Sequence, residues 1–73
     1  MKEQVKAIMA RIFELPAVDD LISAANCDKW DSLHHLNLMI ELEMEFGVEF
    51  EPEEIAGMNS LDTILEILDR KLP

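Results

Sequence analysis

The stretch DSLHHLNLMIELEMEFG, residues 31–47, decides the fold of this chain. Its apolar residues recur with helical spacing, and no proline interrupts it. Asp31 is a favourable N-cap, because its carboxylate can accept backbone N–H groups of the first helical turn. Gly47 suits the left-handed position that follows many helices. The stretch therefore predicts a helix over residues 32–46.

This predicted helix carries two apolar stripes. Each helical residue turns by about 100°, so one stripe lies within about 60° of Leu33 and the other lies on the opposite side of the cylinder. We assign the second stripe to the core; it consists of Leu38, Met39, Leu42 and Phe46. Apolar residues rimmed by charge usually mark a partner site, so we expect the first stripe to be exposed. The alternative is that the long loop over residues 16–30 or a short third helix over residues 52–56 covers the first stripe. The first stripe consists of Leu33, Leu36, Ile40 and Met44.

Three further helices follow from the same rules. Apolar residues spaced three and four apart predict a first helix over 3–15, which Pro16 would stop. Pro52 at a first helical position predicts a short third helix over 52–56. Asn59 or Ser60 would cap a fourth helix, which ends near the basic Arg70 and Lys71. Residues 16–30 form an unusually long connection, which we expect to be packed or functional. The fold class is all-α: a four-helix bundle with three main helices and one short one.

Length and composition limit the function. A chain of 73 residues predicts one domain, residues 1–73, and leaves little room for an enclosed catalytic site. The net charge of −10 argues against nucleic acid or anionic membranes as partners and favours basic protein patches. The single cysteine, Cys27, permits no internal disulfide, and the N-terminus is polar. We expect a cytoplasmic monomer that is not an enzyme and does not insert into membranes.

Ser32 is the candidate attachment site for a covalent group. It opens the predicted helix, where free backbone N–H groups and a partial positive charge stabilise a phosphate. No Lys or Arg occurs between Asp31 and Asp69, while seven glutamates accumulate over residues 41–54. A hydroxyl beside such an acidic surface suits modification by basic partner enzymes. Ordinary helix capping remains the alternative explanation of Asp31-Ser32.

The chain resembles the acyl carrier protein family over essentially its whole length. The resemblance rests on Asp31-Ser32-Leu33, on the acidic apolar helix that ends at Phe46-Gly47, on Pro52-Glu53-Glu54-Ile55 and on Ser60-Leu61. Members of that family have an Asp-Ser-Leu that opens their second helix and a short third helix. Asp31 before the serine favours the acyl rather than the peptidyl branch of carrier proteins.

The resemblance implies a carrier function. A phosphopantetheinyl transferase would move 4′-phosphopantetheine from coenzyme A to Ser32, and the thiol of that arm would carry acyl groups as thioesters between acyl-loading and acyl-transfer enzymes, as in fatty acid or lipid biosynthesis. The acyl chain would be sheltered near Leu42, Ile55 and Met58. The implied partner-binding surface consists of Asp31, Leu33, Leu36, Ile40, Glu43, Met44 and Glu53.

Two departures from the family pattern suggest a specialised pathway. Lys29-Trp30 stands where fatty-acid carriers usually have a glycine two residues before the aspartate, and His34-His35 follows where an acidic residue is usual. These residues reduce the negative charge near Ser32, and Trp30 would add bulk there.

Other functions are weaker candidates. Adjacent helical residues diverge by about 100°, so His34 and His35 are not expected to share a metal ion. No oxyanion-hole glycine motif or strand–turn–helix elbow accompanies Ser32, which argues against a hydrolase. The rival class is an unmodified acidic helical adaptor that binds a basic partner through the stripe from Leu33 to Met44.

Overall fold

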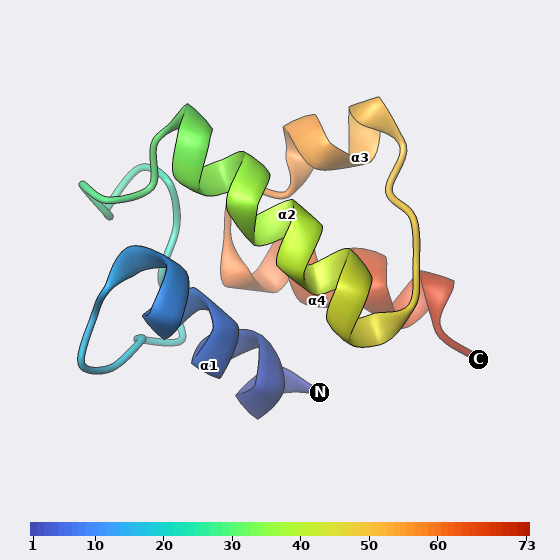
Figure 1. Cartoon of the computed structure of the whole chain (residues 1–73), viewed down its shortest axis with the longest axis horizontal. Coiled ribbons are helices and arrows are strands. Elements are labelled where there is room, and N and C mark those ends of the chain that lie inside the picture. The colour runs from blue at the N-terminus through green and yellow to red at the C-terminus, as the bar shows by residue number, and fades with distance from the viewer.

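The computed structural model describes all 73 residues and contains four helices: α1 (Lys2–Phe13), α2 (Ser32–Phe46), α3 (Pro52–Gly57) and α4 (Leu61–Lys71). The predicted all-α fold is confirmed, including the bounds of α2. The helices α1 and α2 lie side by side and run in opposite directions, α4 lies behind α2, and α3 crosses near one end of the bundle (Figure 1). No helix is long and apolar enough to cross a membrane.

The end of α1 differs from the prediction. The helix ends at Phe13, two residues early, because Glu14 adopts a left-handed conformation with φ 55°. The Leu15 N–H then donates to the Ala10 carbonyl at 2.9 Å, a bond typical of this type of helix ending. The helix therefore stops before Pro16 can act on it.

The core is built only from apolar side chains. One face of each main helix contributes to it, and α3 contributes no fully buried residue. The prediction for α2 is confirmed: Leu38, Met39 and Leu42 are buried, and Phe46 packs partly buried against them. The sixteen buried residues are Val5, Ile8, Met9, Phe13, Val18, Ile22, Trp30, Leu38, Met39, Leu42, Phe50, Met58, Leu61, Ile64, Ile67 and Leu68.

The connection from α1 to α2 is packed, as its length suggests. Val18, Ile22 and Trp30 anchor it in the core. It is also joined to the start of α4, where Ser23 and Ser60 form an isolated β-bridge and the Leu61 N–H donates to the Ile22 carbonyl at 3.1 Å.

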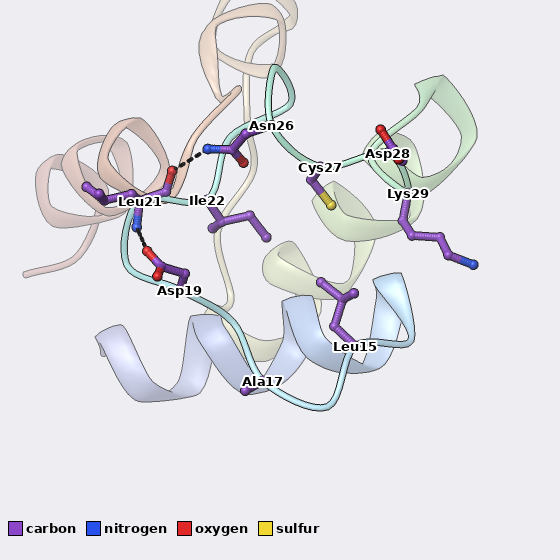
Figure 2. A pocket seen from close by; sticks show the side chains of 9 residues that line it. All are labelled: Leu15, Ala17, Asp19, Leu21, Ile22, Asn26, Cys27, Asp28 and Lys29. Carbon is purple, nitrogen blue, oxygen red and sulfur yellow. Dashed lines mark hydrogen bonds between the residues drawn. The ribbon is translucent and has the colours of Figure 1, made fainter.

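Side chains brace the turns of this connection. The Asp19 carboxylate accepts the Leu21 N–H at 2.7 Å, and the Asn26 amide donates to the Leu21 carbonyl at 2.9 Å (Figure 2). Lys2 and Lys6 of α1 both bind the Asp20 carboxylate, at 2.6 and 2.7 Å. The hydrogen bonds from these two lysines lower the pKa of Asp20 to about 2.

We predict that a matched pair of truncations will separate the two faces of α2. Leu42→Ala removes a fully buried side chain and should lower the free energy of unfolding by about 2–5 kcal/mol. Ile40→Ala removes a side chain that is 53% exposed and should cost less than about 1 kcal/mol. Urea unfolding measures both. Comparable losses in the two variants would show that Ile40 belongs to the core.

We predict that Asp20→Asn will destabilise the fold at neutral pH and not at strongly acidic pH. The folded-state pKa of Asp20 lies below its unfolded value, so the stabilisation is present above about pH 4 and is lost as the pH falls toward 2. The difference in Tm between wild type and variant should therefore shrink over that interval. Asp28→Asn, at an exposed carboxylate with no ion pair, is the control. A difference that stays constant down to pH 2 would contradict the prediction.

Candidate functional site

The N-terminus of α2 is held by Asp31 and leaves Ser32 free. The Asp31 carboxylate accepts the His34 N–H at 2.9 Å, and the Asp31 carbonyl accepts the His35 N–H at 2.8 Å. Asp31 is therefore the N-cap, as predicted. Its pKa is lowered, first by the hydrogen bond from the His34 backbone and then by the one from the His34 ring.

Ser32 is exposed, and its hydroxyl makes no hydrogen bond within the chain. The backbone N–H groups of Ser32 and Leu33 also donate no hydrogen bond. Two free donors thus flank a free hydroxyl at the positive end of a 15-residue helix. This arrangement fits a phosphate ester on Ser32, because the ester oxygens would accept hydrogen bonds that the fold leaves unmade.

Ser60 provides an internal comparison. Like Ser32, it is followed by leucine at the start of a helix. Its hydroxyl, however, accepts the Thr63 N–H at 3.1 Å, and the residue is half-buried. Ser60 is an ordinary N-cap, whereas Ser32 is the residue after its N-cap and has no capping task. The capping explanation thus applies to Asp31 and not to Ser32.

The apolar stripe that begins beside Ser32 is not covered by the loop or by α3. Six large apolar side chains of the chain are exposed, and four of them form this stripe of α2. The exposed fractions are 65% for Leu33, 54% for Leu36, 53% for Ile40 and 75% for Met44. The remaining two, Met1 and Leu21, lie on other segments. The exposed surface of α2 is therefore the main apolar patch of the molecule.

The acidic residues near this stripe have different environments. Glu53 is exposed at the start of α3, whereas Glu43 is half-buried and accepts the Phe50 N–H at 2.9 Å. Glu43 thus fixes the segment between α2 and α3, which the sequence pattern did not reveal. Folding also brings Arg11 to Glu41 at 3.1 Å and Lys71 to Glu54 at 2.9 Å. Two of the seven glutamates in residues 41–54 therefore acquire a cationic partner from distant parts of the chain.

Trp30, which we expected to add bulk near Ser32, adds little of it at the surface. Only 7% of the residue is exposed, and its ring packs on Phe13 with centroids 5.1 Å apart. An apolar indole this large gains more by entering the core than by standing in water. Its polar Nε1–H bonds to His35 Nδ1 at 2.9 Å.

The two histidines diverge, as their positions in α2 predict. The His34 Nδ1–H donates to Asp31 at 2.7 Å, because a carboxylate can only accept. His35 turns inward, to Trp30 and to the Ile55 carbonyl, which lies 2.8 Å from Nε2. The described residues include no cluster of three or more His, Cys, Asp or Glu that suits a metal ion.

Two hollows border the connection between α1 and α2. One, of about 420 Å³, has Ser32 in its lining together with Trp30, His35, Leu36 and Ala56. The larger, of about 530 Å³, lies within the first loop and does not include Ser32; the Cys27 thiol projects into it (Figure 2). Only the smaller hollow adjoins the candidate attachment site.

Comparison with known proteins agrees with this geometry. No protein-family model matches the sequence, and no curated protein matches it. A solution NMR structure of a holo acyl carrier protein from Geobacter metallireducens aligns with 96% of this chain and 83% of its own length, at 25% identity and a TM-score of 0.85. The chain thus has the fold of acyl carrier proteins and is similar to that family. This is the fold of a carrier protein and not of an enzyme.

Proposed function

We propose that this chain is an acyl carrier protein, which bears 4′-phosphopantetheine on Ser32 and shuttles thioester-bound acyl groups between partner enzymes of a specialised cytoplasmic pathway. The observation that carries the proposal is the free Ser32 hydroxyl between two unused backbone donors, at the head of an exposed apolar stripe. When bound, the arm supplies a thiol that forms thioesters. The chain supplies the attachment oxygen, the hydrogen-bond donors for the phosphodiester and the surface that partners recognise.

The attachment reaction would be a phosphoryl transfer. The Ser32 Oγ attacks the phosphorus of coenzyme A that bears the pantetheine, a new O–P bond forms, and the bond to the adenosine bisphosphate breaks. The Ser32 proton passes to a base of the transferase. Such a partner carries Mg²⁺ and basic groups for its phosphates, so it suits the acidic surface around α2 and α3.

The proposed partner surface combines charge with apolar contact. The exposed stripe of α2 would supply the apolar area, and Asp31 and Glu53, both exposed, would supply charge at its rim. Glu43 is part of the proposed surface, and its side chain also has the structural task of binding Phe50. Because apolar contact and charge act at different ranges, they can be separated by experiment.

We predict that Ser32 is the only serine that is modified. Incubation with coenzyme A and a promiscuous phosphopantetheinyl transferase should add one phosphopantetheinyl group to the wild type, as intact mass spectrometry would show. Ser32→Ala should add none. Ser23→Ala, which leaves Ser32 in place, is the matched control and should be modified normally. A wild-type chain that stays unmodified would favour the adaptor function, and modification of Ser32→Ala would place the site elsewhere.

We predict that transferase recognition depends on both charge and the stripe. Higher salt should lower kcat/KM, because the Debye length is only about 8 Å at physiological ionic strength. Ile40→Ala should lower kcat/KM several-fold, since interface truncations act mainly on binding.

Leu21→Ala is the control for this experiment, because Leu21 is 78% exposed but lies in the first loop. It should leave kcat/KM unchanged. An equal loss in both variants, or a rate insensitive to salt, would be incompatible with docking on α2.

A further inference from the structure

His35 joins three parts of the chain through one ring. Trp30 Nε1 donates to Nδ1 at 2.9 Å, and Nε2 lies 2.8 Å from the Ile55 carbonyl. An indole N–H can only donate and a carbonyl can only accept, so Nδ1 carries no proton and Nε2 carries one. We call these three groups, the Trp30 indole, the His35 imidazole and the Ile55 carbonyl, the His35 bridge. It exists in this form only with a neutral imidazole.

The Trp30 end of the bridge is rigid. Only 7% of Trp30 is exposed, and its indole packs on Phe13 of α1 at an interplanar angle of 26° to the His35 ring. The indole therefore cannot turn away easily when the state of the imidazole changes. A second proton, on Nδ1, would point at the indole N–H, and the ring would have to leave this position.

The Ile55 end is attached to the weakest element of the bundle. The helix α3 has six residues and no fully buried side chain. Besides Ile55, which is half-buried, it is held by the ion pair of Glu54 with Lys71 at 2.9 Å. A hydrogen bond from His35 is thus a substantial part of what fixes α3 to α2.

No other titratable group forms a hydrogen bond or ion pair with the His35 ring that could replace the bridge. Asp31, one turn before His35 on its own helix, is engaged by His34, and Glu54 on α3 is engaged by Lys71. The remaining titratable groups of the adjoining loop and of α3 make no hydrogen bond or ion pair with the ring. They include Cys27, Asp28, Lys29, Glu51 and Glu53.

We propose that the His35 bridge holds α3 against α2 only while the imidazole is neutral, and that protonation of His35 releases α3. The hollow beside Ser32 is lined by Trp30, His35 and Ala56 of α3, so release of α3 widens it. The effect of this release on a bound acyl group rests on the proposed function. An acyl chain on the phosphopantetheine arm of Ser32 would gain access to the apolar interior near Ile55 and Met58. His35 is then a positioning residue, and its protonation state determines whether the acyl chain can enter the interior.

The test of the bridge uses the unmodified chain, so it does not depend on the arm. The ¹⁵N shifts of the imidazole report the tautomer, and amide hydrogen exchange at Ile55 and Met58, relative to α2, reports the docking of α3. At neutral pH we expect the Nε2–H tautomer in the wild type. His35→Phe should speed exchange in α3 about fivefold, the effect of one hydrogen bond. His34→Gln, at the neighbouring histidine, should leave α3 exchange unchanged.

Acidification from about pH 8 to about pH 5, the interval in which histidines titrate, should speed α3 exchange beyond its intrinsic pH dependence in the wild type and not in His35→Phe. His35→Gln retains an N–H for Ile55 but cannot titrate, so it should keep α3 protected at both ends of that interval. If His35→Phe does not fold, the pH response of α3 exchange in His35→Gln tests the proposal instead. An Nδ1–H tautomer at neutral pH, the wild-type exchange rate in His35→Phe, or the wild-type pH response in either His35 variant would overturn the proposal.

The proposed effect on the acyl chain, the cargo half of the proposal, is tested on the chain with an octanoyl thioester on its phosphopantetheine arm. At neutral pH, acylation should shift the methyl signals of Ile55 and Met58 more in His35→Phe than in the wild type. Equal shifts would overturn the link between the bridge and the cargo. A chain that cannot be modified at Ser32 would instead contradict the proposed function and the cargo half together, while the release of α3 would still be judged on its own exchange data.

Discussion

The structure depends on the fact that α2 has two apolar faces and so small a chain can bury only one. Leu38, Met39 and Leu42 enter a core shared with α1 and α4, and this burial fixes the position of the helix. The opposite face, from Leu33 to Met44, then has no element left to cover it, because α3 is short and lies across one end of the bundle (Figure 1). The same burial that holds the fold together thus creates the exposed surface.

The start of α2 carries this consequence into function. Asp31 satisfies one donor of the first turn through its side chain, which leaves the donors of Ser32 and Leu33 and the Ser32 hydroxyl available. The covalent attachment proposed for Ser32 and the docking surface proposed for α2 are therefore adjacent for a structural reason. A partner that contacts the stripe near Leu33 and Leu36 meets the serine at the same time.

Local patterns in the sequence were sufficient for the helices and for the two faces of α2. The cap at Asp31, the left-handed Gly47 and the helical spacing between them are short-range features, and α2 has the predicted bounds. The end of α1 was predicted wrongly because a left-handed glutamate has no clear sequence signal. The environment of Trp30 could not be predicted either, since nothing local indicates that its indole finds both a core position on Phe13 and a partner in His35. The contact between His35 and Ile55 and the pairing of Glu54 with Lys71 join residues far apart in sequence, and only the packed bundle brings them together.

Docking on the exposed face of α2 is tested most directly by the footprint of a phosphopantetheinyl transferase on the ¹⁵N-labelled chain, followed by NMR in the absence of coenzyme A. If the uncovered face of α2 is the docking surface, the largest shifts will come from Ser32, Leu33, Leu36, Ile40 and Met44, with weaker ones at the start of α3. The buried face of α2 and the outer surfaces of α1 and α4 will change little. A footprint centred on α1 or on the first loop would contradict docking on α2, because the exposed stripe would then have no part in recognition.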